Sequence, residues 1–159
     1  MISIIYGPKG TGKTKIIIEQ VNTVAKLESR KGDIVFITQD KINSTSIDFN
    51  VRCLYATEFE IHTEEALTGF VKGLVAGNAD IEYLFIDGVL RIVGKGINEI
   101  EDFFKAIEKI EKEYGMKIVL SLSATREEIP EYMVKYLHWF KKLICGFVVL
   151  NDKPVIFIF

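Results

Sequence analysis

The amino-acid sequence predicts an α/β fold, a three-layer α/β/α sandwich with a mainly parallel sheet. Several short segments are continuously apolar, as strands are when helices cover both faces of a sheet; they are residues 2–6, 33–38, 82–87 and 117–122. Segments with apolar residues at helical spacing lie between them, and this alternation is typical of parallel sheets with crossover helices. The 159 residues have the length of one ordinary domain, so we expect a single domain over residues 1–159.

Local signals give the expected bounds of the other elements. Four helices are expected, over residues 13–29, from a Thr63 cap to residue 76, from an Asn98 cap to Gly115, and after Pro130. Residues 51–55 are expected to form a further strand, and residues 88–96 a mobile connection. The tail predicts an antiparallel C-terminal hairpin, with strands at residues 143–150 and 154–159.

The first strand leads into the motif around which the chain is organised. Residues 7–14, GPKGTGKT, fit G-x-x-x-x-G-K-[ST], the phosphate-binding loop, and they stand between a strand and a helix as that motif requires. Glycines let the backbone N–H groups approach an anion, and the helix N-terminus adds partial positive charge. The expected nucleotide-binding residues are Gly7, Pro8, Lys9, Gly10, Thr11, Gly12, Lys13 and Thr14. The domain is therefore expected to bind a nucleoside triphosphate.

A second motif predicts where the metal ion of the nucleotide is held. Residues 82–87, EYLFID, are a buried strand that delivers Asp87 at its C-terminal end, which is the Walker B pattern. Thr14 offers a hydroxyl to Mg²⁺, and Asp87 is placed to hold a water of the ion's shell. The expected metal residues are therefore Thr14 and Asp87. No [N/T]-K-x-D segment for reading guanine follows Leu120, so ATP is favoured over GTP.

Composition and charge exclude several classes of protein. Hydrophobic residues make up 48% of the chain and charged residues 26%, as in soluble globular domains. No apolar run reaches the roughly 18 residues that span a bilayer, and the chain enters its first strand at once, so neither a membrane span nor a signal peptide is expected. The net charge of −2 does not support a broad nucleic-acid surface. Cys53 and Cys145 are isolated, so we expect free thiols and a cytoplasmic location.

The order of elements, with residues 7–14 and Asp87, resembles the core of the RecA-like (KaiC/DnaB-type) P-loop NTPases over most of the chain. The chain departs from related classes at Gly88, where AAA+ proteins and many helicases carry a catalytic acid after the Walker B Asp. In RecA-like proteins the glutamate instead follows the second strand, and the resemblance puts Asp40 in that position. Ser123-Ala-Thr125 resembles a coupling motif of helicases, without their second domain.

The catalytic residues expected on these grounds are Lys13, Asp40, Ser123, Thr125 and Arg126. A Ser/Thr group that ends a strand beside the Walker B strand can contact the γ-phosphate or its attacking water. Arg126, with Arg91 as the other candidate, would stabilise the charge of the transferred phosphoryl group, within the chain or across a subunit interface. A plain strand-to-helix turn and a solvated loop carboxylate are the structural alternatives for Ser123 and Asp40.

The expected function is that of a Mg²⁺-dependent nucleotide-binding protein and slow ATPase, whose output needs another copy, a protein partner or a nucleic acid. Two alternatives remain open: a small-molecule kinase of the nucleoside type, and an ATP-binding switch that does not hydrolyse. On the second expected helix, Gly69, Gly73 and Gly77 recur every fourth residue. We expect them to allow close packing on the sheet, with Gly77 as the helix stop; a groove for another backbone is the alternative.

Overall fold

In the computed structural model, residues 1–41, 46–137, 147–150 and 153–156 are described. The main sheet has five strands, all parallel. In spatial order they are β1 (Ile2–Gly7), β5 (Lys117–Ser123), β4 (Ile81–Ile86), β2 (Asp33–Thr38) and β3 (Val51–Tyr55). The α/β class with a mainly parallel sheet is thereby confirmed. Every predicted strand of this sheet forms, and β5 lies between the strand of the phosphate loop and the strand that precedes Asp87.

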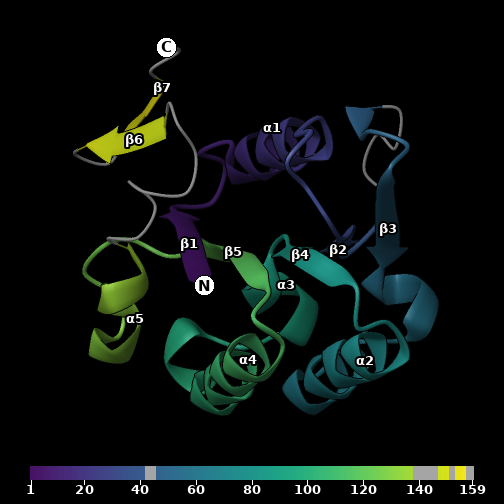
Figure 1. Ribbon diagram of the computed structural model, residues 1–159. Coiled ribbons are helices and arrows are strands. Elements are labelled where there is room, and N and C mark those ends of the chain that lie inside the picture. Colours follow the sequence, from purple (N-terminus) through teal and green to yellow (C-terminus); the bar gives the residue numbers. More distant parts are fainter. Residues whose placement is uncertain (42–45, 138–146, 151–152, 157–159) are drawn as a thin grey trace.

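Helices lie on both faces of the sheet (Figure 1). The helix α1 (Lys13–Ala25) covers one face, and α2 (Glu64–Gly77), α3 (Val89–Val93) and α4 (Glu101–Tyr114) cover the other. The short α5 (Glu131–Leu137) packs beside β1, at the edge of the sheet. Within the described residues, no helix has both the length and the apolar character needed to cross a membrane.

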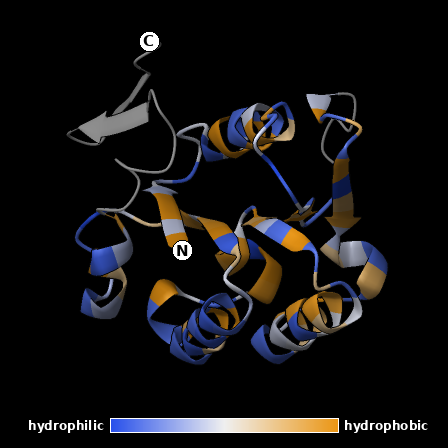
Figure 2. Ribbon diagram, in the orientation of Figure 1, coloured by the Kyte–Doolittle hydropathy of each residue, from blue (hydrophilic) through white to orange (hydrophobic). Residues whose placement is uncertain are grey.

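Two apolar layers hold the sheet between its helices (Figure 2). Along each strand, successive side chains point to opposite faces. Phe36, Phe85 and Val119 therefore belong to the core under α1, whereas their successors Ile37, Ile86 and Leu120 belong to the core under α2 and α4. This alternation determines which face of the sheet the side chain at the end of each strand points to. It therefore determines which of these side chains lie together in the site.

The predicted C-terminal hairpin is present as a second, two-stranded sheet. β6 (Phe147–Leu150) pairs antiparallel with β7 (Lys153–Ile156). Cys145 and the turn at residues 151–152 lie outside the described residues. Cys53 is a half-buried free thiol, and burial raises its pKa.

Two helix boundaries differ from expectation. The first helix ends at Ala25 and not at residue 29, because the chain tightens there and the Lys26 N–H bonds Thr23 O at 3.3 Å. The expected Asn98 cap is wrong: Asn98 lies in the 3₁₀ turn η3 (Ile97–Glu99), and α4 begins at Glu101. The expected Thr63 cap is confirmed, since its hydroxyl accepts from the Ala66 N–H at 3.2 Å.

The glycines of α2 do not pack against the sheet. Gly69, Gly73 and Gly77 are exposed, and a Cβ atom built on any of them meets no atom within 4 Å. The prediction of close packing is therefore wrong. The helix also continues through Gly77 and stops at Asn78, whose backbone is extended.

The expected mobile connection at residues 88–96 contains a helix. Val89, Ile92 and Val93 are buried at helical spacing and form one side of α3. Gly88 and Gly94 have left-handed φ values of 72° and 64° and bound the helix at its two ends. These glycines act as helix boundaries, and the apolar residues between them anchor α3 in the core.

Candidate functional site

The phosphate-loop motif forms the turn between β1 and α1, at the carboxyl edge of the sheet where ligands of open α/β sheets bind. Gly10 and Gly12 have left-handed φ values of 85° and 84°, and nothing lies within 4 Å of a Cβ built on either. The backbone angle, and not lack of space, therefore requires glycine there. Gly12 is also the N-cap residue of α1, so the loop ends where the first helical N–H groups lack partners.

The ammonium group of Lys13 lies back across this loop. Its Nζ donates to Gly7 O and to Pro8 O, each at 2.7 Å, and the residue is 8% exposed. Burial lowers the pKa of Lys13 below the usual lysine value, and the nearby Asp87 carboxylate opposes that shift. A weakly solvated cation held by two carbonyl groups is suited to exchange those partners for an anion's oxygens.

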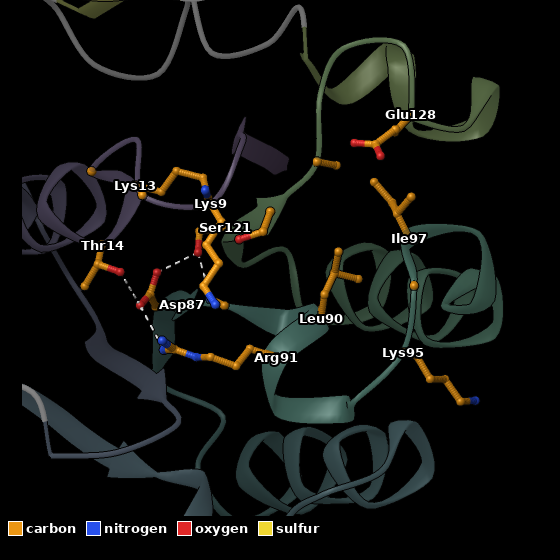
Figure 3. A pocket seen from close by; sticks show the side chains of 16 residues that line it. Lys9, Lys13, Thr14, Asp87, Leu90, Arg91, Lys95, Ile97, Ser121 and Glu128 are labelled. Atoms are coloured by element: carbon orange, nitrogen blue, oxygen red, sulfur yellow. Dashed lines mark hydrogen bonds and ion pairs between the residues drawn. The ribbon is translucent and has the colours of Figure 1, made fainter.

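Asp87 is the centre of a buried polar cluster that joins three elements (Figure 3). Only 1% of the residue is exposed. Its Oδ2 accepts from the Thr14 hydroxyl of α1 at 2.9 Å, and its Oδ1 accepts from the Ser121 hydroxyl of β5 at 2.6 Å. Ser121 in turn accepts from the Gly88 N–H at 2.7 Å. Both carboxylate oxygens are thus oriented by hydroxyl groups.

Arg91 forms an ion pair with Asp87 of this cluster. Its Nη2 lies 3.8 Å from Asp87 Oδ2, and its side chain remains 52% exposed. The guanidinium lies close over Gly88, because a Cβ built on that glycine would stand 3.3 Å from Nη2. The missing side chain at residue 88 therefore leaves room for Arg91 beside Asp87.

A pocket of about 690 Å³ opens in front of these groups. At one end are the phosphate loop, Asp87 and Arg91. Away from Asp87, the lining combines apolar and polar side chains, namely Leu90, Lys95, Ile97 and Glu128. Ser123 and Ala124 also line the pocket, next to Gly7 of the phosphate loop. The Nζ of Lys95 is held at 2.6 Å by Glu64 of α2, so one wall of the pocket is tied to the helix layer beneath it.

The predicted catalytic residues divide into two groups. Lys13 and Ser123 line the pocket. Asp40 is exposed, and neither it nor Thr125 nor Arg126 lines the pocket. The backbone N–H of Thr125 instead donates to the Glu128 carboxylate at 2.6 Å, which closes the turn before α5.

Ser121 and Glu128 are among the pocket residues that the sequence analysis did not assign to the site. Ser121 is the one polar residue inside the apolar run of β5, and a buried hydroxyl two residues before the strand end was a usable signal. Glu128 gives no such signal, since nothing local to it indicates that it lines the pocket.

The donor set fits a hard divalent cation. A Thr hydroxyl and an Asp carboxylate supply oxygen, which Mg²⁺ prefers, and Mg²⁺ bound with nucleotides needs only one or two protein oxygens beside the phosphates and water. Among the described residues, no cluster of three or more His, Cys, Asp or Glu forms a self-sufficient metal site. The arrangement therefore suits a metal ion that arrives with a phosphate ligand.

The chain matches no protein-family model, and no curated protein sequence matches it.

Proposed function

We propose that the chain is a Mg²⁺-dependent nucleoside-triphosphate-binding protein, with ATP preferred, and a slow ATPase whose output requires another copy or a partner. The supporting observation is the 2.9 Å hydrogen bond from Thr14 to Asp87, because it brings together two motifs that are 73 residues apart in the sequence. Neither motif alone defines a nucleotide site. Side by side at the edge of a parallel sheet, they form the two oxygen donors that this class of site uses.

Each group has a defined task in this proposal. The N–H groups of the loop and of the start of α1 bind the phosphates, and Lys13 turns from Gly7 O and Pro8 O to the β- and γ-phosphate oxygens. Thr14 and Asp87 would hold Mg²⁺, which when bound neutralises phosphate charge. Ser121 fixes the orientation of the Asp87 carboxylate. Arg91 can reach from Asp87 toward the γ-phosphoryl group.

Slow hydrolysis is proposed because the site is poor in bases that could orient water. Gly88 follows Asp87, and Asp40 lies outside the pocket. Within the described residues, Glu128 is the second carboxylate that lines the pocket, and it is engaged by the Thr125 N–H. A partner that supplies a base or a cation would then raise the rate, as added arginine groups do in P-loop proteins.

The RecA-like resemblance is part of the same proposal. It is supported by the order of elements from the phosphate loop to Asp87, and by the position of β5, which carries Ser121 and Ser123 beside the Asp87 strand. Assembly with another copy or a protein partner, and a cytoplasmic location, belong to the proposal as well.

One observation favours a second candidate, a small-molecule kinase. The pocket extends beyond Asp87 to Leu90 and Ile97, an apolar wall that phosphates do not need. An acceptor molecule with an apolar body and a hydroxyl group would fit between this wall and the γ-phosphoryl group, with Glu128 to receive the hydroxyl proton. In that case the phosphoryl group passes to the acceptor instead of to water.

Nucleotide binding is tested by calorimetry with ATP and GTP, each with and without Mg²⁺, on wild type and Lys13→Ala. Lys15→Ala is the matched control, because Lys15 lies on the same helix with 83% of its side chain exposed. We expect Mg²⁺–ATP to bind wild type and the control, and binding to fall sharply in Lys13→Ala. Equal affinity in all three proteins contradicts the proposed site.

The two candidate activities differ in where the γ-phosphoryl group goes. Phosphorus NMR of wild type with Mg²⁺–ATP and a nucleoside mixture distinguishes inorganic phosphate from a new phosphate ester. Size measurement with and without a non-hydrolysable ATP analogue tests assembly. Ester formation by a protein that stays monomeric would replace the ATPase proposal by the kinase candidate.

A further inference from the structure

The hydroxyl of Thr38, at the end of β2, has no partner among the protein groups of the described structure. The residue is 1% exposed, and its Oγ1 is buried without a hydrogen bond. Buried hydroxyls are nearly always satisfied in native proteins, because burying one without a partner costs stability. Valine has almost the same shape and would carry no such cost. The hydroxyl therefore calls for a functional explanation.

Thr38 stands beside Asp87 in the sheet. Ile37 pairs with Ile86, and the Asp87 N–H donates to Ile37 O at 2.8 Å, so the next residues of the two strands are neighbours. Ser121 occupies the same level on the other side of Asp87, since Ile86 pairs with Leu120. Thr38, Asp87 and Ser121 thus form one row across three adjacent strands.

All three side chains of this row face α1. Phe36, Phe85 and Val119, two residues earlier on the same strands, belong to the core under α1. Alternation along each strand returns Thr38, Asp87 and Ser121 to that face. The contact of Asp87 with Thr14 of α1 agrees with this placement. Asp87 is therefore flanked by two hydroxyls, and only that of Ser121 is bonded to it.

We propose that Thr38 is a positioning residue that holds a water of the Mg²⁺ hydration shell against Asp87. Mg²⁺ keeps several of its waters when it binds with a nucleotide, and each such water has two hydrogens that need acceptors. With Mg²⁺ bound, Thr38 Oγ1 would offer one acceptor to such a water beside the Asp87 carboxylate. This inference rests on the proposed function and adds an outer-shell residue to it.

The position of Thr38 distinguishes it from the other buried, unpartnered groups. Four other residues have buried side-chain atoms without partners, namely Ser3, Gln20, Arg30 and Tyr132. Ser3 pairs with Val119, two residues before Ser121, and it lies on β1, which β5 separates from the Asp87 strand. Thr38 instead lies directly beside Asp87. Ser3→Ala therefore removes an equally buried hydroxyl away from the metal and serves as the control.

The experiment compares wild type, Thr38→Val, Thr38→Ser and Ser3→Ala. A fluorescent non-hydrolysable ATP analogue is titrated at a series of free Mg²⁺ concentrations, and again in EDTA. We expect Thr38→Val to raise the Mg²⁺ concentration for half-maximal binding by about tenfold, the usual effect of losing an outer-shell partner. Binding in EDTA should stay unchanged, and Thr38→Ser should restore the Mg²⁺ response.

Thermal unfolding of the nucleotide-free proteins separates this role from a structural one. Thr38→Val should unfold at the same temperature as wild type or higher, because it removes an unsatisfied buried group. A lower unfolding temperature, or a Mg²⁺ response within twofold of wild type, overturns the inference. Loss of Mg²⁺–nucleotide binding by wild type would instead refute the proposed function itself, so the two failures are distinguishable.

Discussion

Glu64, the first residue of α2, accepts a hydrogen bond of 2.5 Å from the backbone N–H of Phe103 in the first turn of α4. The carboxylate thus caps a helix on which it does not lie. The residue before α4, Ile100, has no side-chain acceptor, so the cap comes from elsewhere in the fold. Glu64 also binds Lys95 of the pocket wall, which links the start of α4 to the site.

Glu64→Ala should destabilise the protein by about 1–3 kcal/mol, because it leaves the buried Phe103 N–H without an acceptor. Urea unfolding measures the change. Glu64→Gln keeps an acceptor for the Phe103 N–H and should lower the free energy of unfolding by less than Glu64→Ala. Lys105→Ala, which breaks an exposed ion pair on α4, is the control and should change the free energy of unfolding little. Equal losses in Glu64→Ala and Lys105→Ala would contradict the capping role.

Two glycines should respond to alanine in opposite directions. Gly73→Ala fills open space on an exposed helix face and should stabilise the protein by roughly 0.5–1 kcal/mol. Gly32→Ala places a Cβ 2.3 Å from Asp80 O and 2.8 Å from Glu82 Cβ, and the backbone there cannot yield easily. It should destabilise by about 1–3 kcal/mol. Thermal unfolding measures both changes. A lower unfolding temperature in Gly73→Ala would contradict the prediction that the added methyl group meets only open space.

The lowered pKa of Lys13 predicts a pH dependence. Between that pKa and the ordinary lysine value of 10.5, the unfolded state binds more protons at this residue than the folded state. The contribution of Lys13 to the free energy of unfolding therefore rises with pH across this window. Lys13→Met has no titrating group at this position and should not show the rise. Urea unfolding of both proteins from pH 7 to pH 10.5 should show wild type improving relative to the variant. A constant difference would mean that burial does not shift the pKa.

Arg91 and Arg126 should differ in their effect on hydrolysis. Arg91 lines the pocket beside Asp87, whereas Arg126 does not. If Arg91 stabilises the transferred phosphoryl group, Arg91→Ala should lower kcat by up to about 10³-fold with a small change in KM. Phosphate release under saturating Mg²⁺–ATP measures this. Arg126→Ala should hydrolyse ATP at the wild-type rate when the chain is alone. A larger fall in kcat in Arg126→Ala than in Arg91→Ala would assign the role to Arg126 instead.

Signals that lie within a few residues of each other predicted much of this fold. Asp33–Thr38 and Val51–Tyr55 form strands with the predicted bounds, and Thr63 caps α2 as expected. The phosphate loop and Asp87 also come together at one edge of the sheet. In each case a short run of residue types determines the local conformation, and the parallel topology brings the strand ends together.

Features that depend on distant partners were missed. The cap of α4 comes from Glu64 on another helix, so the nearby Asn98 misled the prediction. Asp40 was placed by family resemblance, and the chain after β2 leaves it exposed outside the pocket. The role of Ser121 depends on strand order, because only the neighbouring position of β5 and β4 brings its hydroxyl to Asp87. No local pattern contains that information.

The strand order also governs when the proposed nucleotide site can form during synthesis. In the described structure β1 pairs with one strand, β5, and Ile2 meets Ile118 there. The phosphate loop is therefore synthesised before β2, β3 and β4, the three strands that lie between β1 and its neighbour β5 in the sequence. Non-local parallel pairing is slow to form. The apolar residues of β1 therefore stay unpaired and exposed on the nascent chain until β5 is available. The loop leaves the ribosome early, and the proposed site around it is complete only after β5 has been synthesised.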